Sequence, residues 1–250
     1  EGASAYAVVP VRSNNRLAGR ILSSVSPELA KPSTLDRVDC LYAASVPGGG
    51  LRAVASGSFG PSLASFAFSA SAGWTRRCEE GITWYESASG AASIPARGVL
   101  LYSSDSGGLR AMMSALRAQP TFAFGSGFDD WLEAPVSVGD IGILMNDPAP
   151  ALRSFLGPEI NIPAARMVLY ASPLALGPAA DTVTDGGIPS YALSARLELS
   201  DKRAGRGIAA MLRLAGARDV SVDAEAVSFS GMGLAGEKLA AMADYLYFSK

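Results

Sequence analysis

The chain has 250 residues, and its 21 basic and 23 acidic side chains leave a formal net charge of −2, which argues against a nucleic-acid partner. It contains no histidine, which excludes Ser-His-Asp and Cys-His nucleophile systems and histidine-ligated zinc or haem. Apolar residues make up 49% of the chain and charged residues only 18%, against about 25% in typical soluble domains, so either the core is large or the surface is apolar.

Strands in the first half are marked by β-branched and aromatic runs between Gly or Pro, and helices by apolar residues three or four apart. In chain order we expect a strand at Tyr6–Val11, a helix at Asn15–Val25, strands at Val38–Val46 and Leu51–Phe59, a helix at Pro61–Ala72, strands at Ile82–Glu86 and Val99–Ser104, and a helix at Leu109–Arg117.

The second half shows the same order of elements. We expect a strand at Ile141–Asn146, a helix at Pro150–Leu156, strands at Met167–Ser172 and Tyr191–Leu199, a helix at Lys202–Leu214, strands at Val220–Ala224 and Ala226–Phe229, and a helix at Leu234–Leu246. Both halves thus read β-α-β-β-α-β-β-α.

The halves share little sequence identity, and the order and spacing of their elements support an internal repeat. Leu41–Ser45 is echoed by Leu169–Ser172, and Tyr102 follows Tyr42 at nearly the same interval as Phe229 follows Tyr170. The prediction is an α/β (α+β-like) fold, an α/β/α sandwich of two such repeats with a mixed or antiparallel sheet and amphipathic helices. It forms a single pseudo-symmetric unit, 1–250, with repeat one at 5–118, a linker at 119–140 and repeat two at 141–248.

No motif indicates catalysis. The glycine-rich stretches are turn or capping signals without a phosphate-loop lysine or a dinucleotide spacing. The carboxylate pairs lack the spacing of a calcium loop, and a hydrolase would need one of them to point into a cleft: Glu79 and Glu80, Asp129 and Asp130, or Asp181 and Asp185. We therefore expect a protein that is not an enzyme, with no catalytic residues, no metal and no cofactor.

Cys40 lies in an apolar strand-like run and Cys78 in a charged turn. A disulfide between them is possible if the chain is exported, but their spacing does not decide the question. No run of 18 uncharged apolar residues exists, so we expect no membrane-spanning helix. The chain begins Glu1-Gly2-Ala3-Ser4, which reads as a mature or trimmed form whose signal peptide and anchor cysteine lie outside it.

Several helices have wide apolar arcs with arginine beside them. Pro61–Ala72 carries no charge, and aromatic residues crowd into the linker. This pattern fits helices that lie in a membrane interface, although helices that cover a sheet explain it as well. The candidate membrane-contact residues are Leu63, Phe66, Phe68, Leu109, Met112, Met113, Leu116, Phe122, Phe124, Phe128, Trp131 and Leu132.

The repeated Leu-Tyr-Ala strands, the composition rich in Ala, Ser, Gly and Arg, and the charge-poor amphipathic helices resemble the concealed outer-membrane lipoprotein family of treponemal spirochaetes. This resemblance implies a lipoprotein anchored to the periplasmic leaflet of the outer membrane, with an α/β/α fold and helices that insert into lipid. It carries over no catalytic residues.

We therefore expect a non-enzymatic periplasmic lipoprotein, associated with the outer membrane, that inserts amphipathic helices, binds or moves lipids or amphiphiles, and alters permeability. Its expected partners are a phospholipid membrane, a lipid or amphiphile ligand and a second copy of the chain. The alternative is a soluble periplasmic solute-binding or scaffolding protein that uses a groove between the halves, with the loop Pro173–Pro189 as its lid.

Overall fold

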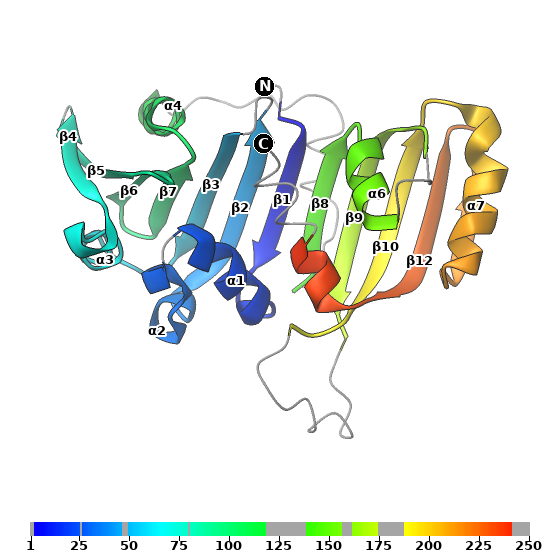
Figure 1. Cartoon of the computed structure of the whole chain (residues 1–250), viewed down its shortest axis with the longest axis horizontal. Coiled ribbons are helices and arrows are strands. Elements are labelled where there is room, and N and C mark those ends of the chain that lie inside the picture. Colours follow the sequence, from blue (N-terminus) through cyan, green and yellow to red (C-terminus); the bar gives the residue numbers. More distant parts are fainter. Residues whose placement is uncertain are drawn as a thin grey trace, which may run out of the picture.

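The computed structural model describes residues 3–25, 27–46, 50–79, 81–118, 139–156, 162–174 and 188–241. Within them, twelve strands form one sheet in the order β11-β12-β10-β9-β8-β1-β2-β3-β7-β6-β5-β4, and every neighbouring pair is antiparallel (Figure 1). The strands are β1 (Ala5–Pro10), β2 (Val38–Val46), β3 (Gly50–Gly57), β4 (Thr75–Glu79), β5 (Ile82–Ser87), β6 (Gly90–Ala96), β7 (Val99–Ser103), β8 (Ile141–Asn146), β9 (Ala164–Pro173), β10 (Tyr191–Leu199), β11 (Asp219–Val222) and β12 (Ala226–Leu234).

Helices connect these strands and cover the sheet. They are α1 (Asn15–Val25), η1 (Pro27–Ala30), α2 (Pro32–Leu35), α3 (Ser62–Ala67), η2 (Ala70–Ala72), α4 (Ser106–Ala118), α6 (Ala149–Leu156), η3 (Lys202–Ala204) and α7 (Gly205–Leu214), and residues 236–241 are also helical.

The two faces of the sheet are covered unequally. The main core lies on the face that carries Val9, Leu41 and Tyr102, and buried residues of α1, α3, α6 and α7 belong to it. A smaller cluster on the opposite face joins Trp84 and Leu101 to Leu109 of α4. Because neighbouring residues of a strand point to opposite faces, Leu101 and Tyr102 put α4 on the other side of the sheet from α3.

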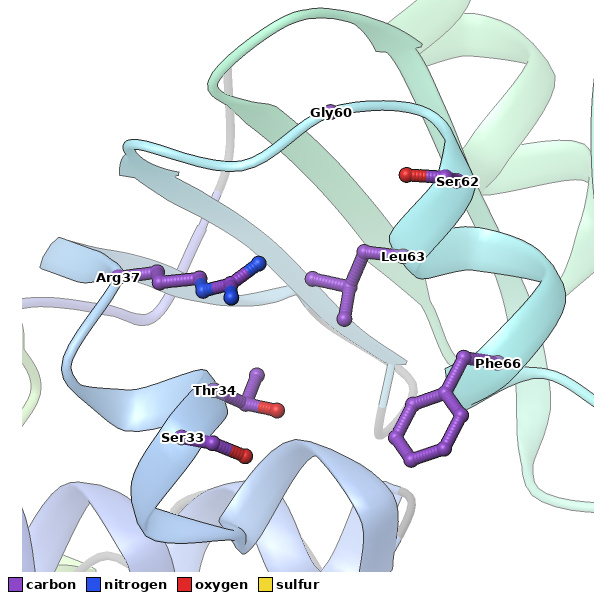
Figure 2. A pocket seen from close by; sticks show the side chains of 7 residues that line it. All are labelled: Ser33, Thr34, Arg37, Gly60, Ser62, Leu63 and Phe66. Atoms are coloured by element: carbon purple, nitrogen blue, oxygen red, sulfur yellow. The ribbon is translucent and has the colours of Figure 1, made fainter.

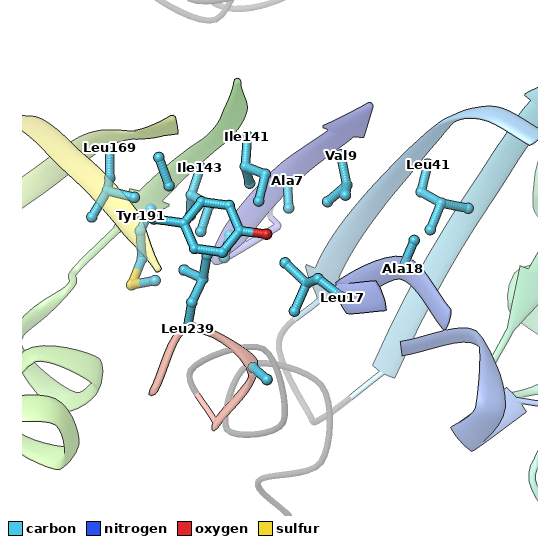
Figure 3. Close-up of a cluster of buried hydrophobic side chains, with 14 of the residues drawn as sticks. Ala7, Val9, Leu17, Ala18, Leu41, Ile141, Ile143, Leu169, Tyr191 and Leu239 are labelled. Atoms are coloured by element: carbon cyan, nitrogen blue, oxygen red, sulfur yellow. The ribbon is translucent and has the colours of Figure 1, made fainter. Parts of the chain in front are cut away.

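The two halves of the chain meet where β1 pairs with β8, and the sheet is continuous there. Figure 3 shows Leu17 of α1 and Leu239 of the 236–241 helix near Tyr191, against strands from both halves. Arg20 of α1 also forms an ion pair with Glu237. Helices from both halves therefore cover the same stretch of sheet.

Most predicted elements are confirmed, and α1, β2, β8 and β10 have the predicted bounds. The predicted helix at Pro61–Ala72 is divided into α3 and η2, and the charged turn around Cys78 is instead strand β4. All five residues of β4 are exposed, so the strand has no apolar alternation. Strand β6 was also missed, because it consists mainly of small residues and contains Pro95 at a register irregularity.

The added strands change how the halves compare. The order β1-β2-β3-β7-β6 matches β8-β9-β10-β12-β11, so β6 occupies the place of β11, and the predicted equivalence of Ile82–Glu86 with Val220–Ala224 is wrong. The β4–β5 hairpin extends the first half alone, which therefore does not read β-α-β-β-α-β-β-α. The duplication itself, and the sandwich of two repeats, stay predictions.

Candidate membrane-contact surface

Phe66 on α3 presents a large apolar side chain to solvent. Its exposed fraction is 53%, and Nζ of Lys31 lies 5.1 Å from the centroid of its ring. Residues 53–75, which include α3 and η2, contain no charged side chain, and much of this segment beyond residue 60 is exposed. An exposed aromatic ring in a segment without charged side chains, with a cation beside it, is typical of a helix that contacts a membrane interface.

A cavity of about 260 Å³ lies between α2 and α3 beside Phe66 (Figure 2). Hydroxyl groups and an arginine line one part of it and apolar side chains the other; the lining residues are Ser33, Thr34, Arg37, Gly60, Ser62, Leu63 and Phe66. The cavity therefore has a polar part next to an exposed aromatic ring.

Two hydrogen bonds fix the backbone of Arg37. Its N–H donates to the carbonyl of Thr34 at 3.0 Å, and its carbonyl accepts from the N–H of Ser58 at 2.6 Å. Gly57 allows this close approach, because a Cβ there would lie 2.0 Å from the Arg37 carbonyl oxygen. The backbone of Arg37 is thus positioned both by α2 and by the residue that follows β3.

The cavity has a positive electrostatic character. One cationic side chain and no carboxylate line it. Other exposed arginines form ion pairs, such as Arg12 with Asp39 at 2.8 Å and Arg196 with Asp223 at 3.1 Å. Within the part of the chain that the structure describes, the Arg37 guanidinium has no ion pair and no hydrogen bond, so its donors remain available.

A second cavity, almost entirely apolar, lies between α1, η1 and strands β2, β3 and β7. It is lined by Val9, Ile21, Leu22, Leu29, Leu41, Tyr42, Ala43, Leu51, Ala53, Ala55, Leu100 and Tyr102. Its volume is about 40 Å³, close to the space of one or two water molecules. In this arrangement of the helices the space is too small for an acyl chain.

The predicted contact residues on α3 and α4 occupy different environments. Phe66 and Leu116 are exposed, while Leu63 and Met112 are half-buried. The remaining three lie in the core, at exposed fractions of 6% or less: Phe68, Leu109 and Met113. Phe68 makes an edge-to-face contact with Trp74 at 4.8 Å.

Phe68, Leu109 and Met113 pack against the sheet, so their side chains are not available for contact with lipid. Phe66 and Leu116 lie on opposite sides of the sheet, so they do not form one flat surface. The five linker candidates lie outside the described residues: Phe122, Phe124, Phe128, Trp131 and Leu132.

Sequence reasoning did not single out Lys31 or Arg37. They flank the four-residue helix α2, which is too short to show a periodic pattern. It also missed Leu214 at the end of α7, which is 89% exposed.

Catalytic chemistry finds no support in the described residues. Glu79 of β4 lines a cavity of about 200 Å³, but it pairs there with Arg110 at 2.9 Å, and no second carboxylate of the described residues lines that cavity. Glu80, Asp129, Asp130, Asp181 and Asp185 lie outside the described residues. No cluster of three or more potential metal ligands occurs in the ranges that the structure covers. None of the described helices is long and apolar enough to cross a membrane.

The two cysteines are free. Cys40 is on β2 and Cys78 on β4, and β3, β7, β6 and β5 lie between these strands. Five inter-strand spacings are on the order of 20 Å, which is too far for a disulfide within one chain.

Comparison with known proteins identifies relatives of the whole chain. The family model described as "Outer membrane-associated lipoprotein TP0453" matches residues 1–239. A solved structure, crystal form I of TP0453, has a TM-score of 0.80 at 22% identity over 99% of this chain and 95% of the other. Crystal forms III and IV have TM-scores of 0.75 and 0.72, also at 22% identity; each covers 97% of this chain, and 94% and 93% of theirs. No curated protein sequence matches.

Proposed function

The chain belongs to the TP0453 family of outer membrane-associated lipoproteins, and on this premise we propose that it contacts the periplasmic leaflet through the surface around Phe66. The family resemblance expected from the sequence is confirmed, and with it the location at the outer membrane. In the proposal the protein is non-enzymatic and is held against the leaflet by α3 and α2.

The exposure of Phe66 within an uncharged segment carries this proposal. Half of a phenylalanine side chain is roughly 100 Å², so its transfer into lipid contributes about 2–3 kcal/mol. Lys31 and Arg37 lie at the level of the headgroups once the ring is inserted. A single anchor of this strength is reversible, which suits a contact that supplements a lipid anchor.

Binding of a lipid or amphiphile follows as the second part of the proposal. The apolar cavity beneath α1 and η1 is the space that such a ligand would enlarge, with Leu29 and Leu41 among its walls. Opening that cavity while α3 is in contact with lipid would also disturb the leaflet, which is the proposed route to altered permeability.

Flotation with neutral phosphatidylcholine vesicles and with vesicles containing phosphatidylglycerol tests the membrane contact. Phe66→Asp should lower vesicle binding ten- to hundred-fold, because it removes the buried ring and adds a charge that must be desolvated. Leu116→Asp is the matched control, since it makes the same kind of change at an exposed apolar residue on the other side of the sheet. It should change binding less than threefold.

Protein that stays unbound at both compositions, with no dye release, would refute the membrane contact. A small polar ligand found by native mass spectrometry would favour the solute-binding alternative, and a phospholipid would favour this proposal. The same spectrum reports whether the chain forms the homodimer expected from the sequence.

A further inference from the structure

We propose that the cavity between α2 and α3 binds the phosphate group of an anionic phosphodiester, with Arg37 as its main ligand. That the phosphate comes from a lipid headgroup rests on the proposed function. The phosphate chemistry of the cavity rests on its own residues.

The side chains around the cavity match a phosphate group. A guanidinium presents N–H donors in a planar fork that fits two phosphate oxygens, and it stays charged at any physiological pH. Figure 2 shows the Arg37 side chain extending into the space between α2 and α3, with Ser33 and Ser62 at its borders. Their hydroxyl groups can donate to the remaining oxygens.

The position of Arg37 favours a ligand over a structural role. Among the described residues its guanidinium makes no ion pair, although ion pairs are formed by Arg12, Arg77, Arg110 and Arg196. Its backbone is nevertheless held by Thr34 and Ser58. Because the backbone of Arg37 is fixed and its side chain faces a cavity without a carboxylate, its guanidinium can bind an anion without first breaking an ion pair within the protein.

The shape of the site suits a headgroup whose acyl chains continue into a bilayer. The cavity volume of about 260 Å³ admits a phosphate with a glycerol unit. Leu63 and Phe66 form the apolar side of the cavity, and the exposed Phe66 ring marks the direction of the acyl chains.

The same lining selects against a zwitterionic headgroup. Choline and ethanolamine carry a cation that finds no carboxylate partner here, because no acidic residue lines the cavity. Lys31, beside Phe66, adds a second positive charge near the opening. The site should therefore prefer phosphatidylglycerol to phosphatidylcholine.

Vesicle binding at 0.15 M salt tests the inference with a pair of charge-matched variants. Arg37→Gln removes the guanidinium and keeps a polar side chain, and Arg206→Gln removes an equal charge on the exposed surface of α7. The wild type should bind phosphatidylglycerol-containing vesicles at least fivefold more tightly than phosphatidylcholine vesicles, the factor expected of one basic side chain at an anionic surface. Arg37→Gln should remove this preference, and Arg206→Gln should change it less than twofold.

A second measurement uses glycerol 3-phosphate in solution, followed by NMR. Chemical-shift changes in the wild type that are absent in Arg37→Gln support the phosphate site, whether the phosphate belongs to a lipid or is free. If such changes occur but vesicle binding shows no preference for phosphatidylglycerol, the ligand is a free phosphate. Equal behaviour of Arg37→Gln and Arg206→Gln in both measurements overturns the inference. If vesicles still bind and respond to Phe66→Asp, the proposed function survives that result; if no vesicle binds but glycerol 3-phosphate does, only the phosphate site survives.

Discussion

Nζ of Lys31 lies 5.1 Å from the centroid of the Phe66 ring, so a cation at the start of the short helix α2 covers the exposed aromatic side chain of α3. At an exposed site such a cation–π contact contributes about 0.5–1 kcal/mol. The pair lies beside the cavity between α2 and α3, so in the proposed membrane contact it would lie between the headgroups and the inserted ring.

Lys31→Gln should weaken binding to phosphatidylglycerol-containing vesicles about fivefold and leave binding to phosphatidylcholine nearly unchanged. The loss should shrink when salt is raised from 0.05 to 0.3 M, because screening weakens the attraction to the surface. Co-sedimentation at the two salt concentrations measures this. An equal loss on neutral vesicles would contradict an electrostatic role for Lys31.

Phe66 and Phe68 are two residues apart and should respond oppositely to truncation. Phe68→Ala should lower the free energy of unfolding by about 3–5 kcal/mol, because Phe68 is 1% exposed and packs on Trp74 and Tyr85. Phe66→Ala should lower it by less than about 1 kcal/mol, since its ring is already in water. Urea denaturation measures both, and a similar loss for the two variants would contradict the burial of Phe68.

Tyr191→Phe should stabilise the protein by about 1 kcal/mol at pH 7. The hydroxyl of Tyr191 is buried in the core where the two halves meet, and it has no hydrogen-bond partner among the described residues (Figure 3). Removing it removes an uncompensated desolvation cost. Urea denaturation of the two proteins measures the difference, and a clear loss of stability in Tyr191→Phe would reveal a partner for the hydroxyl.

The same substitution should alter the alkaline stability. Burial raises the pKa of Tyr191 from 10.0 to about 12. Tyr191 therefore loses its proton at a lower pH in the unfolded chain than in the folded one. Its titration leaves the free energy of unfolding unchanged below pH 10 and lowers it as the pH rises to about 12. Denaturation midpoints between pH 9 and 11 should fall more steeply for the wild type than for Tyr191→Phe, and parallel curves would contradict the raised pKa.

The cysteines should remain separate thiols of unequal reactivity. Cys78 is exposed on an edge strand, while Cys40 is half-buried and burial raises its pKa. Because the thiolate is the reactive form, a disulfide reagent at pH 8 should label Cys78 at least tenfold faster than Cys40. Single Cys→Ser variants assign the two phases. Loss of both thiols on mild oxidation of the monomer would contradict their separation.

The sequence determined the local elements wherever a periodic pattern met a clear end signal. Helix α1 and strands β2, β8 and β10 have the predicted bounds. In β10 the buried residues recur at every second position, which is the spacing of one buried face. The repeated Leu-Tyr-Ala strands, the composition rich in Ala, Ser, Gly and Arg, and the charge-poor amphipathic helices indicated a family of outer-membrane lipoproteins, and the family model confirms that resemblance. The exposed β4 and the small-residue β6 lacked this pattern and were missed.

Only the tertiary structure decided which apolar residues are available to lipid. Periodicity shows that residues share a face of a helix, but long-range packing decides what that face meets. It buried Phe68 and left Phe66 exposed, and it placed α4 on the other side of the sheet from α3. It also brought Lys31 and Arg37 beside Phe66, because the backbone of residue 37 bonds to the end of β3. Such contacts join segments far apart in the chain and depend on three-dimensional packing that no local sequence pattern encodes.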